Sequence, residues 1–175
     1  MRADAERDYV EYARACLNRL RPMAYILSGD PHRAADLVQE TLVKLYVKWP
    51  KIRGVENLDG YVRQILLREF LQEQRRPWAR IRLTGTVAES IGGTQPVPVE
   101  ERSELVAALR QVPARQRSAV VLRFVYDLPV EEVAVLLGCG AGTVKSQTSR
   151  GLATLRRLLE QPAVARSSAG SADGH

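Results

Sequence analysis

Apolar residues recur every three to four positions through most of the first 77 residues, which is the period of an amphipathic helix. The first predicted helix covers residues 5–27, and its apolar face holds Tyr9, Ala13, Cys16, Leu17 and Leu20. Asp30 can cap a second helix, in which Pro31 suits the first position. Pro50 is expected to end that helix, and the turn-rich segment KIRGVENLDG follows it. A third helix, YVRQILLREFLQEQRR, stops before Pro77, so the pattern predicts a helical bundle.

The second and third predicted helices each have a distinct inward side. In the second helix the apolar stripe is formed by Ala34, Val38, Leu42 or Thr41, and Leu45. A separate polar face of the same helix groups Asp36, Gln39 and Glu40. In the third helix the positions at helical spacing are Val62, Ile65, Leu66 and Glu69.

The helical period fades from Arg80 to about Val99, where ESIGGTQPVPVEE supplies two glycines and two prolines. A linker of roughly 20 residues is long for a loop inside one compact domain. We therefore predict two domains, over residues 1–78 and 103–160, joined by a flexible linker at 79–102. The small, polar residues 161–175 are expected to form a disordered tail.

The second domain is predicted to contain four helices. Ser103 is expected to cap the first, Pro113 to start the second and Pro129 to start the third. The fourth lies in LLGCGAGTVKSQTSRGLATLRRLL, where Gly138 suits the left-handed residue that ends a helix. A short helix, a glycine turn and a second amphipathic helix make a helix-turn-helix. No segment has convincing strand alternation, so the predicted fold class is all-α.

The charge distribution indicates what the last predicted helix binds. The chain of 175 residues has a net charge of +6, yet residues 138–157 contain four basic residues and no acid. Lys145, Ser146, Ser149 and Arg150 share one side of the helix, while Val144, Leu152 and Leu155 can face the core. Lys and Arg in the major groove reach guanine edges, and a helix start offers free amides to phosphate. This helix is therefore predicted to bind DNA, with a solvated basic face as the alternative.

The composition argues against several other classes of protein. Cys16 and Cys139 lack the spacing of a zinc site or a disulfide framework, and His32 and His175 are the only histidines. We therefore expect no metal and no cofactor. The charged start MRADAERDY does not look like a signal peptide, and no apolar run reaches membrane-spanning length. A cytoplasmic protein without membrane insertion is expected.

Two separated segments resemble a known family. LPVEEVAVLLGCGAGTVKSQTSRGLATLRRLL, preceded by QVPARQRSAVVLRFVYDL, closely resembles the second conserved region of extracytoplasmic-function (ECF) sigma factors of the sigma-70 family. AADLVQETLVKLYVKWPKI looks like the family's segment for core-polymerase binding and promoter melting, and LDGYVRQILLREFLQEQRRP looks like the helix that follows. The resemblance covers about residues 5–160 and is strongest to the actinobacterial, SigE-like subgroup, which has GTVKSQTSR in its recognition helix.

The resemblance implies a role for each domain. The first, similar to sigma region 2, would bind the clamp helices of the polymerase β′ subunit, and matching positions give Asp36, Gln39, Glu40, Leu42 and Tyr46. The second, similar to sigma region 4, would contact the β flap. It would also bind the −35 promoter element through Thr143, Lys145, Ser146, Ser149 and Arg150. The resemblance also makes an anti-sigma factor a candidate partner.

The first domain would also recognise the −10 element, where the family captures a base flipped from the non-template strand. The corresponding loop is WPKIRGVEN, and the implied DNA-binding residues are Lys51, Arg53, Asn57 and Arg63. Trp49 and Tyr61 are either base contacts or core aromatics, and Arg75 and Arg76 could contact phosphates. The sequence departs from the family at Arg68, where Asn is common, and at Gly140, where Ser is common. The third helix also has Glu69, Gln72, Glu73 and Gln74 in place of arginines.

Two other classes of function compete with a sigma factor. A conventional helix-turn-helix regulator would carry a sensor or dimerisation domain, but a receiver-type first half would show alternating strands and helices with an acidic pocket. A helix-turn-helix recombinase would need a nucleophile among clustered arginines. Ser146 and Ser149 lie inside the predicted DNA helix, where hydrogen bonding is the simpler role. We therefore expect a promoter-specificity subunit without catalytic activity.

Overall fold

The computed structural model describes residues 2–75 and 99–161, with side-chain environments for 2–75 and 104–161. Its helices are α1 (Ala3–Ser28), α2 (Pro31–Ile52), α3 (Leu58–Arg75), α5 (Val99–Gln111), α6 (Ala114–Val120), the π-helix η1 (Val121–Val125), α7 (Val130–Leu137) and α8 (Ala141–Glu160). The described residues contain no strand, which confirms the all-α prediction. Most of the predicted linker and of the predicted tail lie outside the described residues.

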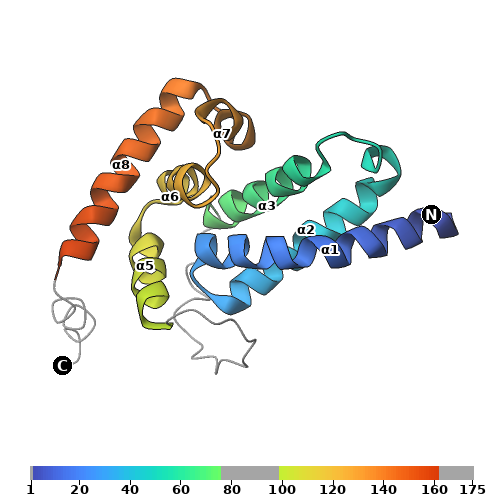
Figure 1. Ribbon diagram of the computed structural model, residues 1–175, viewed down its shortest axis with the longest axis horizontal. Helices are drawn as coiled ribbons and strands as arrows, with labels where there is room; N and C mark the ends of the chain where they lie inside the picture. Colours follow the sequence, from blue (N-terminus) through green and yellow to red (C-terminus); the bar gives the residue numbers. More distant parts are fainter. Residues whose placement is uncertain (1, 76–98, 162–175) are drawn as a thin grey trace.

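The helices form two groups that pack against each other. Helices α1, α2 and α3 lie side by side in one group, and α5 to α8 form the other, with α8 along an outer edge (Figure 1). Between the groups, α3 contacts α6 and α7, and the end of α1 contacts α5. One cluster of buried apolar side chains runs through both groups. The predicted boundaries at residues 78 and 103 stay predictions.

The helix ends follow from local chemistry. At the start of α2, Asp30 Oδ1 accepts hydrogen bonds from the backbone N–H of His32 (2.8 Å) and of Arg33 (3.3 Å), which confirms the predicted cap. Gly29 ends α1 in the left-handed conformation (φ 70°), and its N–H donates to the Tyr25 carbonyl at 2.7 Å. These two adjacent residues set the sharp reversal that lets α2 pack back along α1.

Three predicted helix boundaries are wrong. Helix α2 continues through Pro50 to Ile52, because a proline in the last turn removes only one helical hydrogen bond while buried Trp49 and Ile52 keep that turn packed. Helix α3 begins at Leu58, ahead of the expected start near Tyr61. Helix α5 begins at Val99, so Ser103 lies within it instead of capping it. Residues 99–102 contain neither Gly nor Pro, so none of them prevents the helix from starting before Ser103.

The single helix expected after Pro113 also differs from the prediction. It begins as α6 and turns into the π-helix η1, in which the Tyr126 N–H donates to the Val121 carbonyl at 3.2 Å. The turn that follows contains Asp127 in the left-handed region (φ 49°). This wider turn redirects the chain toward α7 and leaves Phe124 and Val125 exposed.

Two buried polar side chains in the first group of helices, Thr41 and Glu69, have partners. Thr41, rather than Leu42, occupies the fully buried position of the α2 stripe, and its hydroxyl donates to the Leu37 carbonyl at 2.7 Å. Glu69 lies at a buried position of α3, where Lys44 of α2 pairs with its carboxylate. This ion pair explains how an acid fits into the inward side of a packed helix.

Two glycines of α8 are expected to respond differently to replacement by alanine. A Cβ at Gly151 would lie 2.7 Å from Val120 Cγ2 and 3.0 Å from the Gln116 carbonyl oxygen, so overpacking should cost about 1–3 kcal/mol. A Cβ at Gly142 meets nothing within 4 Å, and Ala is favoured over Gly in helices by up to about 1 kcal/mol. Urea unfolding followed by circular dichroism should show Gly151→Ala destabilised and Gly142→Ala unchanged or stabilised. Equal shifts in the two variants would show that α6 and α8 do not pack this closely.

Candidate nucleic-acid interface

The helix-turn-helix is formed by α7 and α8. Gly138 ends α7 in the left-handed conformation (φ 64°), as predicted, and its N–H donates to the Val135 carbonyl at 3.3 Å. The Cys139 N–H donates to the Ala134 carbonyl at 3.0 Å, which completes a Schellman turn. Gly140 is the N-cap of α8 and provides no side-chain cap, so the first amides of α8 keep their capacity to bind an acceptor.

The outer face of α8 has the exposure that a DNA-reading helix needs. Val144 is fully buried and Leu155 is buried, whereas the five predicted contacts are all exposed: Thr143, Lys145, Ser146, Ser149 and Arg150. Among the described residues, neither Lys145 nor Arg150 has an ion-pair partner. Ser146 donates its hydroxyl proton to the Thr143 carbonyl at 3.0 Å, and its oxygen keeps lone pairs that can accept a hydrogen bond. Two free cations and several small polar groups can therefore meet bases or phosphates.

The polar face of α2 is exposed in the first group of helices. Asp36, Gln39 and Glu40 all lie on this surface, as expected from their spacing. Leu42 is half-buried, and its carbonyl accepts a hydrogen bond from the Tyr9 hydroxyl at 2.8 Å. Tyr46 is 40% exposed, and its ring packs edge-on against Tyr9 with centroids 5.0 Å apart. Helix α1 thus fixes one border of the face.

Two exposed valines, which are not among the predicted site residues, extend the α2 face. Val43 is 57% exposed and Val47 is 73% exposed. Together with Asp36 and Glu40 they follow one another at steps of three or four residues, so all four share one side of the helix. Large aliphatic side chains on a soluble surface, next to carboxylates, suit a protein partner better than solvent. The signal in the sequence was their position opposite the buried stripe of the same helix.

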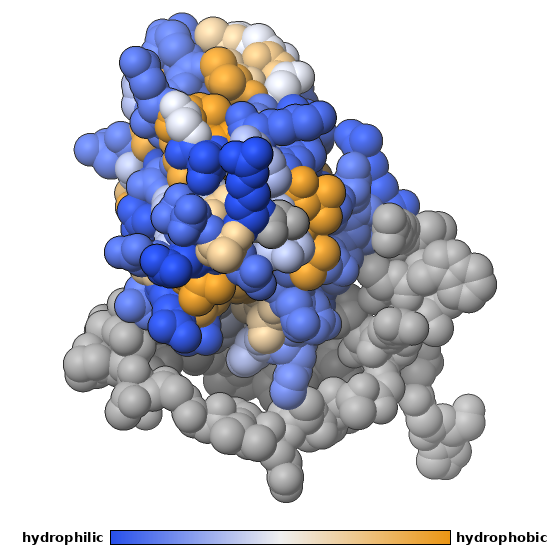
Figure 2. Space-filling view, turned by 90° about the vertical axis from the view of Figure 1, so that its right-hand side faces the viewer, coloured by the Kyte–Doolittle hydropathy of each residue, from blue (hydrophilic) through white to orange (hydrophobic). Residues whose placement is uncertain are grey.

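The predicted −10 residues do not form a single cluster. Lys51 and Arg53 are exposed near the turn between α2 and α3, and Arg53 makes a long ion pair of 3.4 Å with Asp8. Asn57 accepts a hydrogen bond from the Gly60 N–H at 3.0 Å, so its side chain helps to start α3. Figure 2 shows this end of the molecule, where hydrophilic residues surround small apolar patches. Of the four predicted −10 residues, only Lys51 and Arg53 are therefore exposed cations near this turn.

Arg63 lies away from that turn and is half-buried. Its guanidinium carbon lies 5.9 Å from the centroid of the Tyr126 ring, which comes from the end of η1 in the second group of helices. Burial raises the pKa of the Tyr126 hydroxyl, in keeping with a ring enclosed between the groups. In this arrangement Arg63 contacts the protein itself.

The two aromatic alternatives differ in burial. Trp49 is 3% exposed and packs against Tyr9 and Tyr12, with ring centroids 5.6 and 5.4 Å away. It is therefore a core aromatic. Tyr61 is half-buried, and Lys48 Nζ lies 5.8 Å from its ring centroid. Nearby, the Tyr12 hydroxyl donates a hydrogen bond to Asp59 at 2.6 Å. Burial is the main cause that raises the pKa of Tyr12, and this hydrogen bond raises it further.

Comparison with known proteins gives the same two segments. Residues 12–80 match the family model "Sigma-70 region 2", and residues 102–155 match "Sigma-70, region 4". The RNA polymerase sigma-E factor of Streptomyces avermitilis is 34% identical over 158 residues, which cover 87% of this chain and 86% of that protein. The ECF RNA polymerase sigma factor EcfG of Rhodopseudomonas palustris is 32% identical, over 83% of this chain and 81% of the relative. The chain belongs to the ECF sigma factors.

A solved relative supports the fold of this sigma factor. The sigma factor RpoE from Bartonella quintana, crystallised in complex with the anti-sigma factor NepR, superposes with a TM-score of 0.68 at 30% identity. The match covers 87% of this chain and 97% of that chain. Over residues 2–75 and 99–161, no helix has the length and apolar character required to cross a membrane.

Proposed function

We propose that this sigma factor directs core RNA polymerase to a specific class of promoters and contributes no catalytic group to RNA synthesis. The observation that carries the proposal is the presence of both sigma regions, in order, in a chain that exposes an acid-free helix face on α8. A conventional regulator would have a sensor domain in its first half, whereas residues 12–80 of this chain match sigma region 2. Its partners are core polymerase and promoter DNA, so it acts in the cytoplasm.

Helix α2 is the proposed contact for the β′ clamp helices. Its exposed surface combines Asp36, Gln39 and Glu40 with the aliphatic side chains of Val43 and Val47. Such a surface can bury valines at the centre of an interface while carboxylates and amides pair with basic groups at the rim. Tyr46 and Leu42 border this surface on the side held by Tyr9. We infer that this region supplies most of the attachment to polymerase.

The DNA contacts are divided between the two groups of helices. On α8, Lys145 and Arg150 are the proposed readers of the −35 element, with Thr143, Ser146 and Ser149 as hydrogen-bonding partners. Lys51, Arg53 and Arg63 are the proposed contacts beside the −10 element, although Arg63 lies against the Tyr126 ring in this structure. Asn57 shapes the turn that presents them. Two weak sites on one polymerase raise each other's effective concentration.

Two further partners follow from the family. The exposed Phe124 and Val125 of η1 offer an apolar surface of region 4 for the β flap. An anti-sigma factor is also proposed, since the RpoE relative from Bartonella quintana was crystallised with one.

The polymerase contact can be tested with two valines. Val47→Glu is expected to weaken binding to core polymerase at least tenfold, because it places a charge where an exposed valine would be buried. Val10→Glu changes a 39% exposed valine of α1 in the same way and serves as the control. Anisotropy titrations of labelled protein with core polymerase give both affinities. Equal affinities for the two variants would remove α2 from the interface.

A further inference from the structure

The turn between α2 and α3, residues 53–57, is exposed along its whole length. Short-range hydrogen bonds shape it: the Val55 N–H donates to the Ile52 carbonyl at 2.9 Å, and the Gly60 N–H donates to the Asn57 side chain at 3.0 Å. Such bonds set the curvature of a turn but not its place on the protein. That place depends on the two helix ends that the turn connects, since an exposed segment opens easily when its ends are free.

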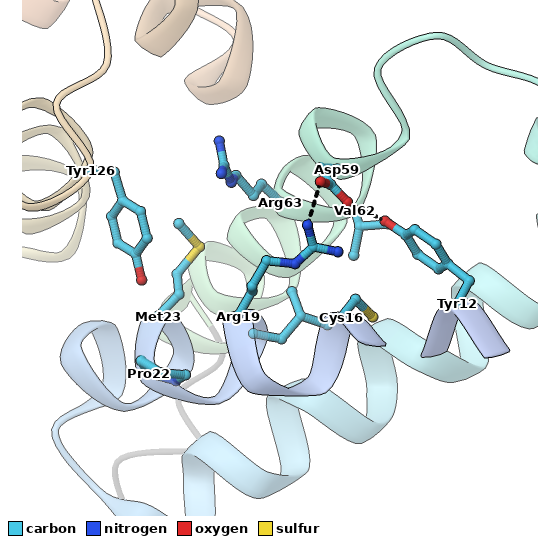
Figure 3. A pocket seen from close by; sticks show the side chains of 10 residues that line it. Tyr12, Cys16, Arg19, Pro22, Met23, Asp59, Val62, Arg63 and Tyr126 are labelled. Atoms are coloured by element: carbon cyan, nitrogen blue, oxygen red, sulfur yellow. Dashed lines mark hydrogen bonds and ion pairs between the residues drawn. The ribbon is translucent and has the colours of Figure 1, made fainter. Parts of the chain in front are cut away.

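Asp59 fixes the start of α3 through two side chains of α1. The Tyr12 hydroxyl donates to Asp59 Oδ1 and Arg19 Nη1 donates to Asp59 Oδ2, each at 2.6 Å. Figure 3 shows Asp59 between these two side chains. The Arg19 and Asp59 side chains are 53% and 43% exposed, so their ion pair contributes little to stability. Because each carboxylate oxygen has its own donor, the two contacts mainly determine where the first turn of α3 lies.

Tyr12 also contacts the end of α2. Its ring centroid lies 5.4 Å from that of Trp49, which is 3% exposed. The Trp49 carbonyl accepts a hydrogen bond from the Arg53 N–H at 3.0 Å, so Trp49 holds the residue at which the turn begins. Tyr12 therefore joins both ends of the turn, because its ring packs on the last turn of α2 and its hydroxyl holds the first turn of α3. Burial raises the pKa of that hydroxyl, which stays a donor at neutral pH.

Asp8 of α1 makes a further contact with the turn. Its carboxylate accepts a hydrogen bond from Arg53 Nη1 at 3.4 Å, at the α2 end of the turn. Asp8, Tyr12 and Arg19 follow one another at steps of four and seven residues, so they share one side of α1. This side of α1 therefore supports the turn at both of its ends, with Tyr12 in the middle position.

We propose that Tyr12 is a positioning residue for recognition of the −10 element: by packing on Trp49 and holding Asp59, it keeps the turn at residues 53–57 in the conformation that receives DNA. This inference rests on the proposed function, which takes Lys51 and Arg53 as contacts beside the −10 element. A turn that is already ordered loses less conformational entropy on binding, and it keeps its DNA contacts in one geometry. Loss of the Tyr12 hydroxyl should therefore weaken −10 binding and relax base preference there, while the outer faces of α2 and α8 stay intact.

The test removes one hydroxyl and keeps the ring. Tyr12→Phe retains the packing on Trp49 but loses the donor to Asp59. Glu73→Gln is the matched control, because it removes an ion pair of 2.9 Å with Arg33 at the other end of α3. Asp59→Ala removes the acceptor, and its combination with Tyr12→Phe completes a double-mutant cycle. Thermal unfolding of the four variants measures their effects on stability separately from DNA binding.

Each full-length variant is assembled with core polymerase and titrated by anisotropy with promoter fragments recovered by transcript mapping. The fragments have an unpaired −10 region and differ in the one base that the wild type reads most strongly. Tyr12→Phe is expected to reduce the preference for the favoured base by roughly two- to tenfold, the worth of one hydrogen bond. The double variant should lose no more than Asp59→Ala alone, because both changes break the same contact. Glu73→Gln should keep the wild-type preference, and all variants should keep the wild-type affinity for core polymerase.

An unchanged base preference in Tyr12→Phe would overturn the proposal, and so would an equal loss in Glu73→Gln. A lower unfolding midpoint of Tyr12→Phe with unchanged base preference would leave Tyr12 a purely structural role. Lys51→Ala and Arg53→Ala test the proposed function in the same assay. If these two weaken −10 binding and Tyr12→Phe does not, the turn still contacts the promoter and the positioning role is wrong. If all three bind like the wild type, the turn is not a −10 contact, and the inference fails together with that part of the proposed function.

Discussion

Replacing Lys145 and Arg150 of α8 with Ala is expected to cost about 1–3 kcal/mol of promoter binding each, if both side chains read base edges. The two exposed cations lie on an acid-free face and have no ion-pair partner among the described residues. Removing both should lower the affinity for a −35-dependent promoter by roughly thirtyfold to more than ten-thousandfold. Run-off transcription with saturating core polymerase and varied promoter concentration measures this loss.

Arg157→Ala is the matched control, because it removes an exposed arginine from the last turn of the same helix. The dependence on salt distinguishes two roles for each cation. Loss of a phosphate contact lowers the salt slope by about one, whereas loss of a base contact relaxes sequence preference. If Lys145→Ala and Arg150→Ala both retain wild-type promoter use, the assignment of α8 as the −35 reader fails.

Phe70→Ala is expected to destabilise the fold by about 3–5 kcal/mol, the cost of truncating a large aromatic side chain in a packed core. Phe70 is fully buried in α3, and its ring lies beneath the Arg117 guanidinium. The variant therefore loses both apolar packing and the aromatic contact of a buried cation. Thermal unfolding should show a midpoint lower by roughly 6–20 °C for a chain of this size.

The exposed ring of Phe124 provides the comparison for Phe70. Phe124→Ala should change the free energy of unfolding by less than about 0.5 kcal/mol, because its ring is largely in solvent. Phe70→Leu keeps an apolar side chain in the core and should fall between the two. A change of less than 2 °C in Phe70→Ala would contradict the packing described around α3.

Local rules predicted what depends on local structure. Asp30 caps α2 and Gly138 ends α7 because each acts on amides or dihedral angles within a few residues. The same rules placed the end of α2 too early at Pro50, because packing of Trp49 and Ile52 outweighs one missing hydrogen bond. The π-helix η1 was also not predicted, since helical periodicity does not distinguish it from the end of an α-helix.

Helical periodicity predicted only part of the candidate sites, because it does not reveal contacts between residues far apart in the chain. The outward side of α8 followed from its sequence, because neighbours on one helix fix which residues share a face. In contrast, Arg63 faces Tyr126 and Arg117 reaches Leu27 across long stretches of chain. The choice between base contact and core for Trp49 likewise required its burial beneath Tyr9 and Tyr12.

Transcription in vitro shows directly whether this ECF sigma factor selects promoters for RNA polymerase. Purified protein is added to sigma-free core polymerase and a genomic promoter library, and transcript starts are sequenced. New starts that share two spaced upstream elements are expected with the wild-type protein, and they should be lost with the Lys145→Ala, Arg150→Ala double variant. An absence of new starts, with wild-type protein that binds DNA on its own, would show that the protein does not select promoters for the polymerase and would favour a conventional helix-turn-helix regulator.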